Sequence, residues 1–343
     1  MLPILIIKFG TASITDALGN LDEAIIKEVA RQVASLQKNF RIVLVSSGAV
    51  GAGKKWIKNF KGELKQRKAA AAIGNPVLME VYRKYFEKFD IPVAQSLCER
   101  GHFANRAQFL QLKETYETLW ESGAIPIANE NDVVSDVELK FSDNDELATL
   151  LAAGFGAETL MFSTSVGGLL DQNGQIVKQI SKIDEQIWKL VDRSKSSLGL
   201  GGMLSKLSFA QRANQLGIKV IIFAARQENS ILDALETKAG SHFEPEKVNM
   251  TLKQKWISTG SIIAGKVCVD AGAEAAIKGR KSLLAVGISN IEGEFEEGEV
   301  IELMNESKLC IAVGKAKVGS KILKDNLKTR KFEVAHADDI VIF

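Results

Sequence analysis

Short apolar runs alternate with longer amphipathic stretches along the first two thirds of the chain. The runs are typical of buried strands, and the stretches repeat apolar residues at helical spacing. Predicted strands are 4–9, 41–47, 91–97, 124–129, 159–163 and 220–225; predicted helices are 21–37, 63–89 with an interruption at 74–76, 106–121, 143–153 and 203–216. Because strands alternate with helices of this length, we predict an α/β fold, an αβα sandwich around a mostly parallel sheet.

The pattern changes near residue 238. A polar stretch over 238–252 is predicted to be a linker. Short apolar runs then recur between glycine-containing turns, with one helix near 271–278. This spacing predicts a small β-rich barrel or sandwich domain over 253–343, after a larger domain over 1–237.

Composition narrows the class of protein. The chain has 343 residues, 46% of them hydrophobic, which is enough for a sizeable core. Its 44 basic and 42 acidic residues leave a net charge of +2, too small for a general attraction to nucleic acid or membranes. The three cysteines have no CxxC spacing, and no apolar run approaches the roughly 18 residues of a membrane helix. We therefore expect a cytoplasmic protein with reduced cysteines and no membrane partner.

Candidate phosphate-binding groups follow the first two predicted strands. Lys8 stands at the end of the first strand, before Gly10. After the second, the spacing from Gly48 to Lys54 nearly matches a Walker A motif, but Lys55 stands where that motif needs Ser or Thr for magnesium. We therefore disfavour the Walker interpretation, and a strand followed by a flexible turn explains these glycines.

A second lysine opens a later helix. The segment GLGGMLSK over 199–206 combines glycines, free helical N–H groups and Lys206 in the first turns. Helix N-termini of this kind bind phosphate, because the unpaired N–H groups and the helix dipole both favour an anion. We favour phosphate binding over a simple helix cap.

Amide and acidic side chains cluster at two further predicted strand and helix ends. One cluster is 129–132 and the other is 143–145. Asp and Asn are common helix caps, but an Asn can also donate to a carboxylate and an Asp can accept from an ammonium group. The two clusters therefore suit an amino-acid substrate. A side-chain carboxylate is ionised at neutral pH, with a pKa of about 4, so it could attack a phosphoryl group without a catalytic base.

Several segments together resemble the glutamate 5-kinases, a family of the amino-acid kinase fold that carries an appended PUA domain. The matching kinase segments are IIKFGT at 6–11, RIVLVSSGAV at 41–50, AAIGNPVLM at 71–79, IPIANENDVV at 125–134, FSDNDELATLLA at 141–152 and GLGGMLSKLSFA at 199–210. The PUA-like segments are 255–277 and 293–303. The match runs over nearly the whole chain, and the order and spacing of the segments make it specific.

The resemblance implies ATP-dependent phosphorylation of L-glutamate to L-glutamyl 5-phosphate, the first step of proline synthesis, with Mg²⁺ as a cofactor. The implied catalytic residues are Lys8, Lys206, Asp143 and Asp145. The implied glutamate-binding residues are Ser47, Gly48, Asp132 and Asn144. The implied nucleotide-binding residues are Lys8, Thr164, Ser165, Leu200, Gly201, Gly202, Met203, Leu204, Ser205 and Lys206. It also implies feedback by proline and a homo-oligomer, either a dimer or a tetramer.

The chain departs from the family pattern at Ser165, Leu200 and Leu204, all on the nucleotide side. Two alternatives therefore stay open. One is another acid kinase of this fold, acting on acetylglutamate or aspartate. The other is a non-catalytic RNA-binding or regulatory protein with a degenerate kinase domain. PUA modules suggest RNA as a partner, and basic residues do gather over 315–331, but the nearly balanced charge of 253–343 disfavours it.

Overall fold

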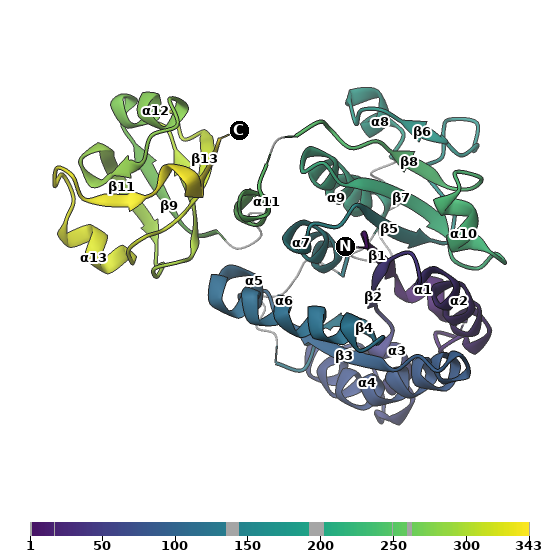
Figure 1. Cartoon of the computed structure of the whole chain (residues 1–343). Helices are drawn as coiled ribbons and strands as arrows, with labels where there is room; N and C mark the ends of the chain where they lie inside the picture. The colour runs from purple at the N-terminus through teal and green to yellow at the C-terminus, as the bar shows by residue number, and fades with distance from the viewer. Residues whose placement is uncertain are drawn as a thin grey trace. The chain divides into compact units, whose positions relative to one another are not determined.

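The computed structural model describes residues 2–16, 18–134, 144–191, 202–248, 250–258 and 263–342 (Figure 1). The chain divides into two compact units. The first contains residues 1–99 and 114–248, and the second contains residues 100–113 and 249–343. Each unit has its own sheet and its own hydrophobic core.

In the first unit, eight strands within the described residues form one sheet. They are β1 (Ile4–Phe9), β2 (Arg41–Ser46), β3 (Val93–Cys98), β4 (Ile125–Glu130), β5 (Thr159–Thr164), β6 (Gln179–Ile180), β7 (Lys219–Ala224) and β8 (Ser241–Phe243). Their order is β3-β4-β2-β1-β5-β7-β8-β6, and each pairing is parallel except that of β7 with β8. The predicted mostly parallel sheet is confirmed, with β1 near its centre.

Helices cover both faces of this sheet. The described helices of the first unit are α1 (Thr11–Ile14), α2 (Glu23–Leu36), α3 (Ala49–Gly53), α4 (Leu64–Phe86), α7 (Asn144–Phe155), α8 (Glu185–Lys189), α9 (Met203–Gln215) and α10 (Ser230–Leu235). Helix α2 begins cleanly because the Asp22 carboxylate accepts hydrogen bonds from the N–H groups of Ala24 and Ile25.

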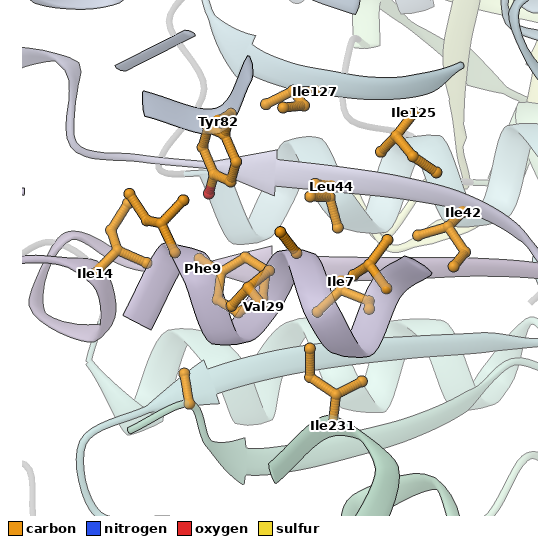
Figure 2. Packing of buried hydrophobic residues seen from close by; sticks show 14 of the residues in the cluster. Ile7, Phe9, Ile14, Val29, Ile42, Leu44, Tyr82, Ile125, Ile127 and Ile231 are labelled. Atoms are coloured by element: carbon orange, nitrogen blue, oxygen red, sulfur yellow. The ribbon is translucent and has the colours of Figure 1, made fainter. Parts of the chain in front are cut away.

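The alternation of side chains along β1 decides which residues meet which helices. Leu5, Ile7 and Phe9 join a core with α2, α4 and α10, part of which Figure 2 shows. Successive strand residues point to opposite faces, so Lys8 points to the other face, where α7 packs on β1 and α9 packs on α7. The same rule turns the core residues of β2 and β4, such as Leu44 and Ile127, toward α4 (Figure 2).

Helices α3 and α4 touch through their backbones. A Cβ on Gly53 would lie 1.9 Å from the Ala70 carbonyl oxygen, and a Cβ on Gly74 would lie 1.7 Å from the Ala49 carbonyl oxygen. Lys54 donates to the Leu18 carbonyl oxygen at 2.7 Å. The segment from Gly48 to Lys54, which nearly matches a Walker A motif, thus contacts α4 through Gly53 and the loop at Leu18 through Lys54.

The helix predicted over 63–89 is not interrupted at 74–76. Helix α4 continues through Pro76, although proline lacks the N–H for one helical hydrogen bond. Leu78, Tyr82 and Phe86 are buried on its core side, and this burial offsets the lost bond. Gly74 is where α3 approaches, rather than a helix end.

We expect Gly74→Ala to lower the free energy of unfolding by about 3 kcal/mol, the upper range for overpacking, because the new methyl overlaps backbone that cannot rotate away. Chemical denaturation measures this loss. Gly101→Ala is a matched control, since a Cβ at Gly101 meets nothing within 4 Å. Equal stabilities of the two variants would contradict the close helix contact.

The second unit is β-rich, as predicted. Strands β11 (Ile288–Gly293), β9 (Ile263–Val269), β12 (Val300–Met304), β13 (Cys310–Lys315) and β15 (Ile340–Ile342) form a sheet in that order. Strands β10 (Leu283–Leu284) and β14 (Glu333–Ala335) pair separately, and the unit also contains helices α11 (Leu252–Ser258), α12 (Ala271–Lys278) and α13 (Ser320–Asp325). The predicted helix near 271–278 is α12. Strand β11 has few buried residues, so its apolar signal was too weak to predict it.

The segment predicted as a linker, 238–252, contains β8, which pairs with β7 in the large sheet. Strand β8 is short and lies in a polar stretch, so the sequence pattern does not predict it. The second unit is also not a single stretch of sequence, because residues 100–113 belong to it. This segment contains α5 (Gly101–Ala104) and the start of α6 (Arg106–Glu121). There the Trp256 indole N–H donates to the Phe103 carbonyl oxygen at 2.9 Å. No helix in the described ranges combines the length and apolarity needed to cross a membrane.

Candidate active site

Two lysines meet one carboxylate on the α7 face of the large sheet. Lys8 Nζ forms an ion pair with Asp145 Oδ1, and Lys206 Nζ lies 3.0 Å from Asp145 Oδ2. The side chains are 4% exposed for Lys8, 6% for Lys206 and 0% for Asp145. Two ammonium groups share one carboxylate in this trio, and such an arrangement of cations suits an anionic ligand.

Local structure explains why these three residues meet. Lys8 is the fifth residue of β1, at the carboxyl edge of the parallel strands. Asp145 lies in the first turn of α7, and Lys206 lies in the first turn of α9, after the N-cap residue Gly202. Glycine has no side chain to cap the helix, so the first N–H groups of α9 can face a ligand.

Some of the residues predicted to bind nucleotide lie on the elements that carry or flank this lysine pair. Thr164 ends β5, the strand that pairs with β1 beside Lys8. Met161 belongs to the core on the α2 face, so strand alternation places Thr164 on the same face as Lys8. Ser165 follows it and is exposed. Gly202 caps α9 and residues 203–205 begin it, whereas Asp143, Leu200 and Gly201 lie outside the described residues.

A second polar cluster brings together predicted glutamate-binding residues. Asn144 Nδ2 donates to Ser47 Oγ at 2.8 Å and to Asn129 Oδ1 at 2.8 Å. Asn144 Oδ1 accepts from the Glu130 N–H at 3.3 Å. Asn144 and Asp145 are consecutive residues of α7, so the start of this helix carries both the centre of the polar cluster and the carboxylate that holds the two lysines.

The remaining predicted residues lie at the same edge of the sheet. Gly48 links β2 to α3 with a φ of 108°, a left-handed conformation that favours glycine. A Cβ there would also approach Ile14 Cδ1 at 3.1 Å. Asp132 lies two residues beyond β4 and is half-buried. Its neighbour Asn131 donates to Glu99 Oε1 at 2.8 Å, which ties this loop to the end of β3.

Sequence reasoning missed two residues of α4 that reach this site. Asn75 Oδ1 accepts from Asn129 Nδ2 at 3.3 Å, so the polar cluster extends across to α4. Two turns further along α4, the Tyr82 hydroxyl lies 2.9 Å from Ser46 Oγ, and burial raises the pKa of Tyr82 to about 12. An Asn on a buried helix face is a signal for such a role, but the sequence predicts an interruption of the helix at 74–76 and so gives Asn75 no helix face.

Comparison with known proteins gives the family of this chain. A model described as the amino acid kinase family matches residues 3–224, and a PUA domain model matches residues 265–336. The chain belongs to the amino acid kinase family and carries a PUA domain. This confirms the family resemblance of the sequence and the fold predicted from it.

Within that family, the chain is similar to proteins named glutamate 5-kinase. The one from Vibrio vulnificus strain YJ016 is 33% identical over 98% of this chain and 95% of its own length. The one from Thermotoga maritima is 35% identical over 92% and 88%, respectively. Solved structures show the fold. Giardia lamblia carbamate kinase bound to AMP-PNP gives a TM-score of 0.51 at 16% identity, and Ureaplasma parvum UMP kinase gives 0.50 at 14%; each covers 71% of this chain and 99% of its own.

Proposed function

We propose that this protein transfers the γ-phosphoryl group of ATP to the γ-carboxylate of L-glutamate, forming L-glutamyl 5-phosphate and ADP in the first step of proline synthesis. The observation that carries this proposal is the buried Lys8–Asp145–Lys206 group, joined through Asn144 to a polar cluster. The relatives named glutamate 5-kinase support the choice of acceptor.

The reaction needs charge stabilisation and alignment rather than a base. The glutamate γ-carboxylate is ionised at neutral pH, since its reference pKa is about 4.3. One of its oxygens bonds to the γ-phosphorus while the bond to the β,γ-bridging oxygen breaks, and ADP leaves with that electron pair. Lys8 and Lys206 neutralise charge on the transferring group, and Asp145 holds both ammonium groups in position.

The acceptor lies between the two clusters in this proposal. Its γ-carboxylate faces the lysine pair, and its α-carbon faces Ser47, Asn144 and the loop that carries Asp132. Asn144 donates to Ser47 Oγ, so the Ser47 hydroxyl keeps its own hydrogen to donate to a carboxylate. The Asp132 carboxylate suits the α-ammonium group. Such positioning of both reactants is itself a large part of phosphoryl-transfer catalysis.

Magnesium belongs to this proposal as the ion that accompanies ATP. Phosphate oxygens and water supply most of the ligands of Mg²⁺ in kinase sites. The described ranges contain no group of three or more His, Cys, Asp or Glu residues arranged for a metal. The donor set present, two lysines on one carboxylate, fits a nucleotide whose phosphates bring the ion with them.

An acyl-phosphate trap tests the proposed function. Purified protein is incubated with MgATP and hydroxylamine, with L-glutamate, L-aspartate, N-acetylglutamate or no acceptor, and hydroxamate and ADP are measured. We expect hydroxamate with L-glutamate alone, and omission of ATP is the control. A preference for aspartate or acetylglutamate would assign another acid kinase, and folded protein that is inactive with all acceptors would contradict a kinase. Adding L-proline to the same assay tests feedback inhibition.

A further inference from the structure

Asn75 carries a buried donor for which the described structure shows no acceptor. The residue is 5% exposed, and its Oδ1 accepts from Asn129 Nδ2 at 3.3 Å. Its Nδ2 has no hydrogen-bond partner among the described residues. A buried amide donor without an acceptor is destabilising, so native proteins rarely keep one without a use.

The direction of the amide is set by the backbone. The Glu130 N–H can only donate, and it does so to Asn129 Oδ1 at 3.0 Å and to Asn144 Oδ1 at 3.3 Å. The other end of Asn129 is therefore Nδ2, a donor, which must face the oxygen of Asn75. Asn75 consequently presents its NH₂ group away from Asn129, and an amide flip would place two donors against each other.

The backbone holds Asn75 close to the proposed acceptor site. Its neighbour Gly74 packs directly on Ala49, two residues after Ser47. Ser47 itself bonds to Asn144, and Asn144 bonds to the Asn129 side chain that touches Asn75. Oδ1 and Nδ2 of Asn75 are bonded to the same carbon. Nδ2 therefore lies at the border of this polar cluster, although it faces away from Asn129 itself.

We propose that Asn75 Nδ2 donates a hydrogen bond to the α-carboxylate of the acceptor amino acid and so determines specificity for it. This inference rests on the proposed function. The γ-carboxylate belongs at Lys8 and Lys206 on the α7 face, whereas Asn75 comes from α4 on the opposite face of the sheet. Asn75 therefore meets the other end of the substrate, and of the two groups there only the carboxylate accepts a hydrogen bond.

The test compares glutamate with γ-aminobutyrate, which is glutamate without its α-carboxylate. Calorimetry measures the Kd of each compound for the wild type, Asn75→Asp and Asn75→Ala. A hydrogen bond to a charged group contributes about 1.5 to 3 kcal/mol, or roughly a 10- to 150-fold change in affinity. We expect both variants to lose that factor for glutamate and to bind γ-aminobutyrate as well as the wild type does.

Asn75→Asp keeps the acceptor for Asn129 and replaces only the NH₂ group. Asn75→Ala introduces no buried charge. If one variant fails to fold, the other still tests the proposal. Thermal unfolding confirms that each is folded. Equal loss of affinity for both compounds would mean that Asn75 is only structural, and unchanged glutamate affinity would mean no contact; either overturns the inference. Wild-type protein that does not bind glutamate would overturn both proposals. Glutamate binding without hydroxamate formation would contradict the proposed function alone.

Discussion

Replacing Lys206 with alanine is expected to lower kcat by about 10²- to 10³-fold, the usual cost of losing one donor that acts on transition-state charge. The KM for glutamate should change little, because the Lys206 ammonium group acts on the phosphoryl group and the polar cluster around Asn144 remains. Lys8 still pairs with Asp145 in this variant, so the fold should persist. Steady-state kinetics with saturating MgATP measures the effect.

Lys178→Ala is the matched control, since Lys178 is an exposed lysine of the same unit. It removes the same charge without touching the site, and its kcat should equal that of the wild type. If Lys206→Ala kept the wild-type kcat, the Lys206 side chain would have no part in the mechanism. A large rise in the glutamate KM with unchanged kcat would instead make it a ground-state binding residue.

Asp145→Asn should be the most destabilising conservative change in the site. The substitution removes the carboxylate that pairs with both Lys8 and Lys206 and puts a neutral amide in its place. Breaking a buried ion pair in this way costs about 3–5 kcal/mol of unfolding free energy. Activity should also fall, because the carboxylate no longer fixes the two ammonium groups. Chemical denaturation and the hydroxamate assay measure the two effects.

MgATP provides an internal check on this variant. Its phosphate oxygens would supply the missing negative charge, so MgATP should raise the melting temperature of Asp145→Asn more than that of the wild type. Asp184→Asn is the matched control, because Asp184 caps α8 at the surface and Asn caps equally well. Wild-type stability of Asp145→Asn would contradict the close ion pairs in the site.

Local patterns predicted much of the fold because they are properties of short segments. A buried β-branched run identifies β1, and helical spacing identifies α2 and α9, whatever the rest of the chain does. The parallel sheet followed from their alternation, and it placed Lys8 at a strand end and Lys206 at a helix start. Strand β8 escaped because three residues in a polar stretch carry too little periodicity to predict an element.

The sequence by itself determined the class of the protein. Strand-end and helix-start lysines, the amide and acidic clusters and their order were all readable, and they indicated phosphoryl transfer to an acidic amino acid. The glycines of 48–53 were readable too, but their use was not. Whether a glycine faces a phosphate or another helix depends on which backbone comes close, and here α4 does.

Only the tertiary structure decided which of these residues touch. One carboxylate binds two lysines, and Asn144 reaches Ser47 across 97 positions of sequence. Asn129 and Asn75, 54 positions apart, are joined because strand order places β4 next to β2 and α4 covers that face. Periodicity specifies an element and its buried side. Contacts between elements depend on how these faces pack together, and the pattern within one segment does not determine that packing.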